Sequence, residues 1–385
     1  MKRILTIILA LPLLTACGQS SSSPENVMPT EEAAYTEQTA EQFGIQPGKG
    51  YVPLNYSYVK GEWLPYMRYE EMMSGRSADD FRSAFREYLT DAAGEGINTV
   101  YLHVHPCGDA YYRSEIFPAG AYLKGDYDPL EIMLGEAHAL GISAHAWINP
   151  LRCQTVEQMQ ELPGDFIVKE WSDAPDCRIA KTVNGRWYLD PAYEETDRLL
   201  CRCIAEIIGN YDVDGIHIDD YFYPESDPSF DAEEFSASGA DDLSQWRLSN
   251  CTRMVRSMYD AVKAADSRVQ FGISPQGSIS GNYNSQFADV KLWCGSEGYC
   301  DYIAPQLYFG FRNESCPFAE TLAMWEDMTS DKVDLVIGLG AYKLGKPDKW
   351  AGAAGESEWA DEPDIIERQI ALVGASSADG YALYK

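Results

Sequence analysis

The sequence is poor in positive charge and has no basic block. Its 30 lysines and arginines stand against 60 aspartates and glutamates, which gives a formal net charge of −30. Nucleic-acid binding requires basic groups that neutralise phosphates, so this composition argues against nucleic acid as a partner. A strongly acidic surface suits an extracellular environment.

Long apolar runs are also lacking, apart from a short one at the N-terminus. This run covers residues 4–14 after Lys2 and Arg3, which fits an export signal and is too short for a membrane-spanning helix. It ends in Leu14-Thr15-Ala16-Cys17, which resembles the cleavage site of bacterial lipoproteins. The resemblance implies that residues 1–16 are removed and that Cys17 carries a lipid, which would anchor an extracytoplasmic protein to the bacterial cell membrane. The alternative is an ordinary secretory signal.

The chain after Cys17 divides into a tether and a body. Residues 17–50 hold few large apolar side chains and many polar ones, so they cannot bury enough surface to fold. Residues 51–385 form one domain of a length typical of barrels. Ten cysteines are present without any CxxC pair, and we expect most of the nine after Cys17 to be small buried hydrophobic residues, with room for one or two disulfides.

The body repeats a unit of β-branched strand, loop and amphipathic helix. Strands are predicted at Gly61–Met67, Thr99–His105, Ser143–Asn149, Gly215–Tyr221, Val269–Ser274, Tyr302–Tyr308, Leu335–Tyr342 and Gly380–Tyr384. Helices are predicted at Ser77–Gly94, from Asp128-Pro129 to Gly141, from Asp190-Pro191 to Asn210 and at Leu243–Ala265, with a hairpin turn at Asn184-Gly185.

Eight such units predict an α/β fold in which parallel strands close into a (β/α)8 TIM barrel. An open doubly wound sheet is the alternative, but no glycine-rich phosphate turn follows the first strand. The last helix of the pattern is missing after the eighth strand, so either the chain is a fragment or the barrel closes without that helix.

Active sites of such barrels lie where the strands end, so polar residues at the predicted strand ends are informative. Four of the five histidines fall on predicted strands. The polar and aromatic residues in this position are His103, His105, Trp147, Asn149, His217, Asp219, Asp220, Gln306 and Tyr308.

The segment from Asp214 to Pro224 carries the strongest signal. Strand alternation places His217 and Asp219 on the inner side, with Ile216 and Ile218 against the helices. A carboxylate at this position can serve as the nucleophile or base in hydrolysis of a sugar bond, while a protonated one serves as the acid. We therefore predict that Asp219 is the catalytic carboxylate; the other interpretation is that it pairs with a histidine.

These motifs together resemble the glycosyl hydrolase-like 10 family of bacterial cell-surface proteins. The resemblance rests on residues 96–100, 108–112, 127–130, 145–150, 214–224, 246–247, 271–275 and 301–308. It implies a barrel that hydrolyses glycosidic bonds, with cell-wall glycan strands as a plausible substrate. The fourth strand also resembles the nucleophile strand of the α-amylase clan, with Asp219 at the nucleophile position and His217 in place of an arginine.

The sequence departs from these relatives in three places. Glutamine and arginine are usual where it has His103 and His105, and an acidic residue is common where it has Cys107. The segment 271–276 lacks the acid that the α-amylase clan carries on its fifth strand. The second catalytic group therefore stays open between Asp109, Glu115 and Asp220, while Asp190 before Pro191 is better explained as a helix N-cap.

Aromatic and polar side chains near these ends predict carbohydrate binding, with no cofactor. Trp147, Trp187, Tyr221, Tyr223 and Tyr308 offer faces for sugar rings. Hydrogen bonds to sugar hydroxyls are expected from His103, His105, Asn149, Arg152, His217 and Gln306.

Three alternatives remain at this point. A metal-dependent hydrolase could use His103 and His105 with His217 and Asp219, but later strands add no histidine, so we expect no metal. A binding protein could keep the sugar cleft without the acid. A nucleophile at Cys107 would need an oriented triad that the sequence does not reveal.

Overall fold

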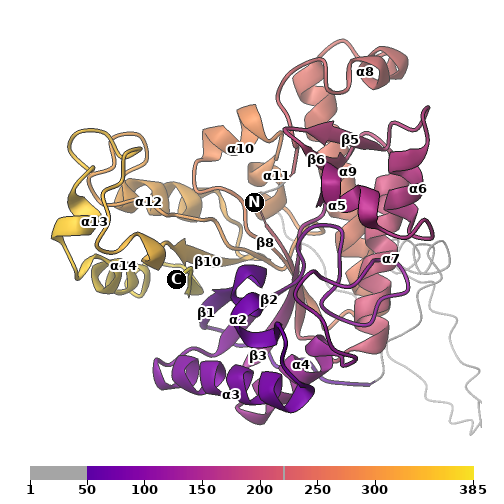
Figure 1. Cartoon of the computed structure of the whole chain (residues 1–385). Coiled ribbons are helices and arrows are strands. Elements are labelled where there is room, and N and C mark those ends of the chain that lie inside the picture. Colours follow the sequence, from indigo (N-terminus) through magenta and orange to yellow (C-terminus); the bar gives the residue numbers. More distant parts are fainter. Residues whose placement is uncertain (1–49, 220–221) are drawn as a thin grey trace, which may run out of the picture.

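The structure is a computed structural model that describes residues 50–219 and 222–385 (Figure 1). The predicted export signal, Cys17, residues 17–49 of the tether, Asp220 and Tyr221 lie outside these ranges. Within them, no helix is long and apolar enough to cross a membrane.

Eight parallel strands form a closed barrel in the order β1-β11-β10-β9-β8-β7-β3-β2. Their bounds are β1 Val59–Leu64, β2 Thr99–His105, β3 Ser143–Ile148, β7 Gly215–Ile218, β8 Gln270–Ile273, β9 Tyr302–Ile303, β10 Asp334–Leu339 and β11 Gly380–Leu383. The barrel closes through pairing of β1 with β11, in which Val59 lies opposite Gly380. The predicted (β/α)8 fold is confirmed.

Helices surround the strands, as Figure 1 shows. They are α2 Tyr69–Met73, α3 Ala78–Gly94, α4 Pro129–Ala139, α5 Val156–Glu161, α6 Ile167–Asp173, α7 Glu194–Asn210, α8 Ala232–Ser238, α9 Leu243–Ala265, α10 Ile279–Ser285, α11 Val290–Gly295, α12 Phe318–Met328, α13 Glu358–Asp361 and α14 Ile365–Val373, with 3-10 turns η1 Tyr66–Arg68 and η2 Ala341–Lys343. Ser77 caps α3 through a capping box, and Asp128 caps α4 with Pro129 behind it, as the sequence predicts.

The helix expected to open at Asp190 begins four residues later, at Glu194. The Asp190 carboxylate accepts a hydrogen bond from the Ala192 backbone N–H (2.8 Å) and lies 2.6 Å from the Lys181 ammonium group. These contacts hold a turn ahead of α7, so Asp190 stabilises the approach to the helix and is not its N-cap.

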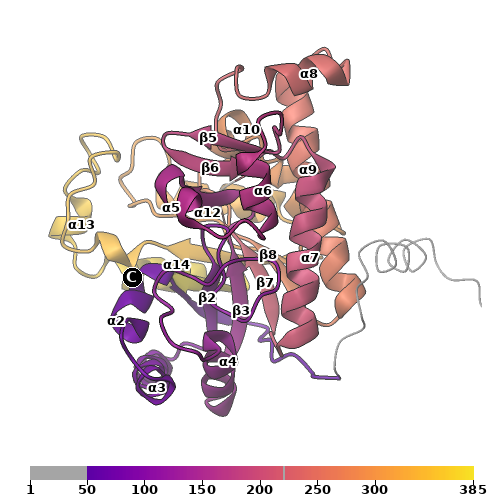
Figure 2. The ribbon, with the colours of Figure 1, turned by 45° about the vertical axis from the view of Figure 1, so that its right-hand side comes forward.

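A second sheet lies between β3 and α7. Its strands β4 (Arg152–Thr155), β5 (Ala180–Val183) and β6 (Arg186–Leu189) pair antiparallel in the order β4-β6-β5. The predicted hairpin turn is confirmed, because Asn184 and Gly185 both adopt positive φ angles of 48° and 78° between β5 and β6. Figure 2 shows this sheet, with α5 and α6, beyond the ends of β2 and β3.

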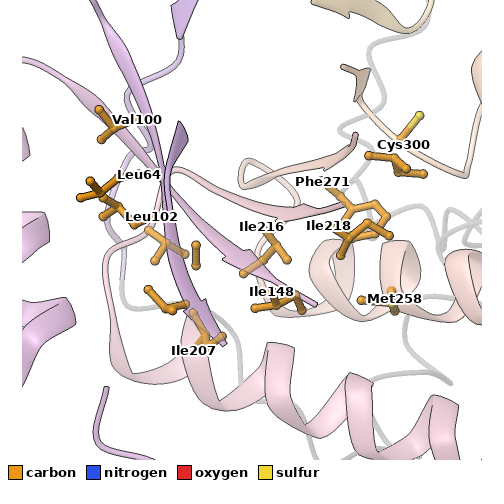
Figure 3. Close-up of a cluster of buried hydrophobic side chains, with 14 of the residues drawn as sticks. Leu64, Val100, Leu102, Ile148, Ile207, Ile216, Ile218, Met258, Phe271 and Cys300 are labelled. Carbon is orange, nitrogen blue, oxygen red and sulfur yellow. The ribbon is translucent and has the colours of Figure 1, made fainter. Parts of the chain in front are cut away.

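The outer face of the barrel packs against helices. Ile216 and Ile218 on β7 belong to the same cluster of buried side chains as Ile207 of α7 and Met258 of α9 (Figure 3). All four side chains are at most 4% exposed, so the expected orientation of the two isoleucines is confirmed.

The inner face is filled by large rings that require glycines beside them. Trp63, Tyr101, Trp147 and Tyr302 form one buried cluster inside the barrel. A Cβ on Gly272 would lie 1.8 Å from the Tyr302 ring, so only glycine fits there. Below its mouth the barrel is therefore a packed core.

Residues 51–55 cover the end of the barrel where the strands begin. Asp214, directly before β7, accepts hydrogen bonds from the Tyr51 hydroxyl (2.7 Å) and from the backbone N–H groups of Leu54 (2.5 Å) and Ala144 (2.7 Å). Its second oxygen lies 2.9 Å from Nε2 of His138. Asp214 thus ties the start of the described chain to β3 and β7.

Two further sequence predictions are refined. The sixth strand was expected to reach Tyr308, but β9 ends at Ile303 because Pro305 has no N–H for the ladder; isolated bridges resume at Gln306. All nine described cysteines are free thiols and seven are buried, which confirms their expected role as small hydrophobic residues.

Candidate active site

A cavity of about 280 Å³ opens at the end of the barrel where the strands finish. This is the end at which TIM-barrel active sites lie. Its walls combine aromatic rings with a few polar groups and one arginine: Trp63, Tyr66, Met67, His103, Trp147, Asn149, Arg152, Asp219, Ser274, Gln306, Tyr308, Tyr342 and Tyr384. Seven of these residues were predicted from the sequence: His103, Trp147, Asn149, Arg152, Asp219, Gln306 and Tyr308.

Among the described residues that line the cavity, Asp219 is the one that carries a carboxylate group. It follows β7 directly and is only 5% exposed. The neighbouring strand end is fixed beside it, because the Ser274 backbone N–H donates to the Ile218 carbonyl (2.7 Å). A carboxylate in a small cleft lined by hydrogen-bonding groups can act on a bound ligand.

His103, Trp147 and Asn149 form a stacked and hydrogen-bonded unit beside Asp219. The His103 and Trp147 rings lie parallel with centroids 3.6 Å apart, and His103 Nε2 is 3.2 Å from Asn149 Oδ1. The Asn149 amide nitrogen donates to the Pro106 carbonyl (3.0 Å), which fixes Oδ1 as the acceptor toward His103. The His103 proton therefore sits on Nε2 and leaves Nδ1 as an acceptor.

This unit keeps two polar atoms without a protein partner. His103 Nδ1 and Trp147 Nε1 are buried and make no hydrogen bond with described residues. Burial, assisted by the positive charge of Arg152, holds the pKa of His103 well below its usual value, so the ring stays neutral. A neutral acceptor and an indole donor in residues that line the cavity are therefore left without a partner among the described residues.

Below the cavity, a directional hydrogen-bond chain runs through the barrel interior. Trp63, whose indole lines the cavity, donates from Nε1 to Nε2 of His217 (3.0 Å). Since an indole only donates, His217 carries its proton on Nδ1 and donates to the Tyr302 oxygen (2.9 Å). The Tyr302 hydroxyl then donates to His145 Nδ1 (2.9 Å), and His145 Nε2 faces Asn55 Oδ1 at 3.3 Å.

Every polar atom of this chain has a partner, and both histidines are neutral. Burial lowers the pKa of His145 to about 4 and holds that of His217 well below its usual value. The chain fixes the orientation of the Trp63 indole at the cavity floor. His217 itself is fully buried and does not line the cavity, although the sequence predicted it there.

The opposite wall is aromatic. Tyr308 and Tyr384 stack with centroids 6.0 Å apart, and Tyr342 meets Tyr308 edge-on at 5.8 Å. Gln306 is held beside them, because its Nε2 lies 3.2 Å from the Ser274 carbonyl and 3.3 Å from the Ser274 hydroxyl. Such rings present apolar faces suited to the C–H surfaces of sugars.

Asp109 lies near the cavity without lining it. Its carboxylate accepts a hydrogen bond from the Cys107 backbone N–H (2.9 Å). Burial raises the pKa of Asp109 to about 6, against the lowering effect of that hydrogen bond and of the positive charges of Arg152 and Arg186. The group can therefore keep a proton close to neutral pH, which is what a general acid needs.

Other predicted residues lie away from the cavity. His105 is buried against Phe117, with ring centroids 4.2 Å apart. The Tyr223 hydroxyl donates to Asp231 (2.5 Å), and the Tyr223 ring packs under Arg247. Both side chains are used in packing, and a register shift in the pairing of β2 with β3 falls between His103 and His105.

Glu115 and Trp187 are also outside the cavity. Glu115 lines a separate surface groove with Arg113 and Glu206, whose carboxylate accepts from the Glu115 backbone N–H (2.6 Å). Trp187 borders another groove beside β5. Asp220 and Tyr221 lie outside the described residues, so their predicted roles stay predictions.

Sequence reasoning missed six residues of the cavity: Trp63, Tyr66, Met67, Ser274, Tyr342 and Tyr384. All lie on or directly after predicted strands, so the rule that selected Gln306 and Tyr308 would have found them.

The geometry also bears on the metal alternative. His103 contacts Trp147 and Asn149 while His105 contacts Phe117, so the two imidazoles have different surroundings. In residues 50–219 and 222–385, no three His, Cys, Asp or Glu side chains gather in a way that could hold a metal ion.

Comparison with known proteins gives a consistent result. Residues 79–359 match the family model described as glycosyl hydrolase-like 10. The chain is 29% identical over 380 residues to glycosyl hydrolase DigH of Escherichia coli strain K12, covering 89% of this chain and 84% of that one. It is 30% identical over 328 residues to glycosyl hydrolase YngK of Bacillus subtilis strain 168, covering 77% of this chain and 61% of that one.

Solved structures share the fold at low identity. The PgaB (BpsB) glycoside hydrolase domain from Bordetella bronchiseptica superposes with a TM-score of 0.56 at 9% identity, over 85% of this chain and 94% of that one. Alpha-L-fucosidase isoenzyme 2 from Paenibacillus thiaminolyticus superposes with a TM-score of 0.53 at 15% sequence identity, over 85% of this chain and 46% of that one. These likenesses show a common barrel architecture.

Proposed function

The chain belongs to the glycosyl hydrolase-like 10 family and is a glycoside hydrolase, and we propose that it cleaves poly- or oligosaccharides at the cell surface, with peptidoglycan glycan strands as substrate. The observation that carries the proposal is the buried carboxylate of Asp219 in the cavity at the strand ends. The family relationship and the aromatic, hydroxyl-binding walls of that cavity support a carbohydrate ligand.

In this proposal Asp219 acts as the ionised carboxylate. It either attacks the anomeric carbon or removes a proton from the attacking water, while a protonated carboxyl group gives its proton to the departing oxygen. Asp220 follows Asp219 in the sequence, and Asp109 has the raised pKa of an acid. We assign the supporting role to one of these two residues.

The remaining polar groups would orient the sugar. His103 Nδ1 can accept and Trp147 Nε1 can donate a hydrogen bond, and both lack a partner among the described residues. Asn149, Arg152 and Gln306 add polar contacts to the same walls, and Tyr308 with Tyr384 offers an apolar face.

The test is Asp219→Asn, which keeps the shape of the side chain and removes its charge. Loss of a catalytic carboxylate should lower the rate of glycan-strand hydrolysis by roughly 10³-fold or more while the thermal midpoint changes little. Hydrolysis by liquid chromatography and unfolding by calorimetry would be measured on one preparation.

Near wild-type cleavage by Asp219→Asn would refute the assignment. Asp109→Asn is the companion variant, because its loss of rate distinguishes Asp109 from Asp220 as the acid. Wild-type protein that binds glycans without cleaving any of them would instead favour a carbohydrate-binding barrel.

We also propose that a lipid on Cys17 anchors the protein to the outer side of the bacterial cell membrane. The support is the sequence Leu14-Thr15-Ala16-Cys17 after a short apolar run. A fatty-acid probe should label the wild type and not Cys17→Ala; equal labelling of both would show that this segment is an ordinary secretory signal.

A further inference from the structure

The cavity is too small for more than a short piece of a polysaccharide. Its volume of about 280 Å³ lies at the low end of ligand pockets, which hold roughly 300–1,000 Å³. A glycan strand with one sugar bond beside Asp219 must therefore continue over the rim of the barrel mouth. The rim formed by the loop after β10 has an unusual surface.

This rim, residues 342–350, exposes large apolar side chains. Trp350 is 89% exposed, and Tyr342 and Leu344 are 39% and 38% exposed. The segment leads from the end of β10 to α13, so it belongs to the loops on the catalytic side of the barrel (Figure 1). Tyr342 also lines the cavity, which makes the rim continuous with the site.

The rim is held firmly although its tip faces water. The Lys343 ammonium group donates to the Tyr308 carbonyl (2.6 Å) and to the Asp348 carboxylate (2.8 Å). The other Asp348 oxygen accepts from the Trp350 backbone N–H (3.1 Å). On the far side, the carbonyl of the buried Ala351 accepts from the Glu314 backbone N–H (2.8 Å).

The backbone of Trp350 is thus anchored on both sides while the indole has no cover. A pre-positioned aromatic ring loses little conformational freedom when a ligand stacks on it. Two exposed lysines, Lys346 and Lys349, belong to the same segment in a chain whose net charge is −30, and the Lys346 ammonium group donates to the Tyr342 carbonyl (2.8 Å). Ammonium groups can donate hydrogen bonds to the hydroxyls and carboxylates of a glycan.

We propose that Trp350, with Lys346 and Lys349, forms a distal subsite on which a glycan strand rests while one of its bonds lies in the cavity. The proposal builds on the function proposed above and adds a preference for long chains. Trp350 does not touch the reacting bond, so it determines substrate length and takes no part in the chemistry.

The experiment compares Trp350→Ala with wild type on long glycan strands and on a short oligosaccharide that fills only the cavity. Stacking on an indole should lower the KM for long strands roughly tenfold, so Trp350→Ala should raise that KM by this factor. The kcat on both substrates and the KM for the short one should not change. Met324→Ala on α12, where Met324 is 56% exposed, is the matched control and should behave as wild type.

Equal KM values of Trp350→Ala and wild type on long strands would overturn the proposal, as would an equal effect of Met324→Ala. Binding of long strands to Asp219→Asn, with and without Trp350→Ala, is measured alongside by affinity electrophoresis. If wild type cleaves nothing, the proposed function fails, and the electrophoresis still tests the subsite. A variant that loses affinity only for phosphatidylglycerol vesicles would show that the rim contacts membrane, which also overturns the proposal.

Discussion

The mouth of the barrel and its interior contain the same kinds of side chain but differ in how their polar atoms are satisfied. In the interior, Trp63, His217, Tyr302 and His145 form one chain in which each donor meets an acceptor. At the mouth, His103 and Trp147 stack closely, yet His103 Nδ1 and Trp147 Nε1 have no partner among the described residues.

This difference distinguishes the two interior histidines from His103, for which a contact with the substrate is proposed. A buried polar atom without a partner costs free energy, and because His103 and Trp147 also line the cavity, we propose that a ligand completes their two unpaired atoms. His217 and His145 have completed bonds and support the floor under the cavity. His103 has one completed bond, to Asn149, and one atom available to a substrate.

The largest effect on stability is expected from Tyr302→Phe. The change leaves the His217 Nδ1 donor and the His145 Nδ1 acceptor buried without partners, which should cost roughly 2–5 kcal/mol of unfolding free energy. Urea unfolding measures this cost. Tyr127→Phe is the matched control, because the Tyr127 hydroxyl has no partner in residues 50–219 and 222–385 and its loss should be nearly neutral. Similar costs for both variants would mean that the interior chain is no more stabilising than an isolated hydroxyl.

The next effect concerns pH. Burial lowers the pKa of His145 to about 4, so between pH 6.5 and 4 the unfolded chain binds a proton that the folded one excludes. The contribution of His145 to the free energy of unfolding is fully present above pH 6.5. It decreases by about 3 kcal/mol as the pH falls from 6.5 to 4.

Asp109 and Asp190 have pKa values raised to about 6, so the folded protein binds their protons at a higher pH than the unfolded chain does. These two groups therefore increase the free energy of unfolding as the pH falls. A comparison of wild type with His145→Gln isolates the histidine. From pH 6.5 to 4 the wild type should lose about 3 kcal/mol more than the variant, in urea unfolding at each pH. Parallel curves would show that His145 becomes protonated inside the fold.

Among Tyr302→Phe, His145→Gln and His103→Phe, the smallest effect is expected from His103→Phe at the mouth of the barrel. His103→Phe keeps a ring against Trp147 and removes the acceptor, so kcat/KM on glycan strands should fall roughly tenfold. The unpaired Asn149 oxygen should cost about 1 kcal/mol of stability, less than Tyr302→Phe. A loss of stability without a loss of rate would show that His103 supports the fold, as His217 and His145 do, and does not contact the substrate.

The sequence predicted much of the fold because periodic signals are local. Strand alternation oriented Ile216, Ile218 and Asp219 correctly, and the residues Asn184-Gly185 specified a hairpin. The bounds of β9 and α7 were missed because they depend on Pro305 in the ladder and on contacts of Asp190 with Lys181.

The site was harder to predict because depth along the barrel decides which inward residue reaches the cavity. His217 and Asp219 share one face of β7, yet the first lies in the packed interior and the second at the mouth. His105 and Tyr223 were expected at the mouth as well, and their packing against Phe117 and Arg247 follows from tertiary contacts that no spacing rule contains.

The attachment of residues 51–55 has a mechanical consequence. The chain joins the barrel at the end where the strands begin, which is opposite the cavity. A force that acts on the described chain at residue 50 is therefore borne first by the bonds from Tyr51 and Leu54 to Asp214, at the end of the barrel opposite the cavity. In the lipid-anchored protein that we propose, the cavity would therefore open on the side of the barrel that faces away from the membrane.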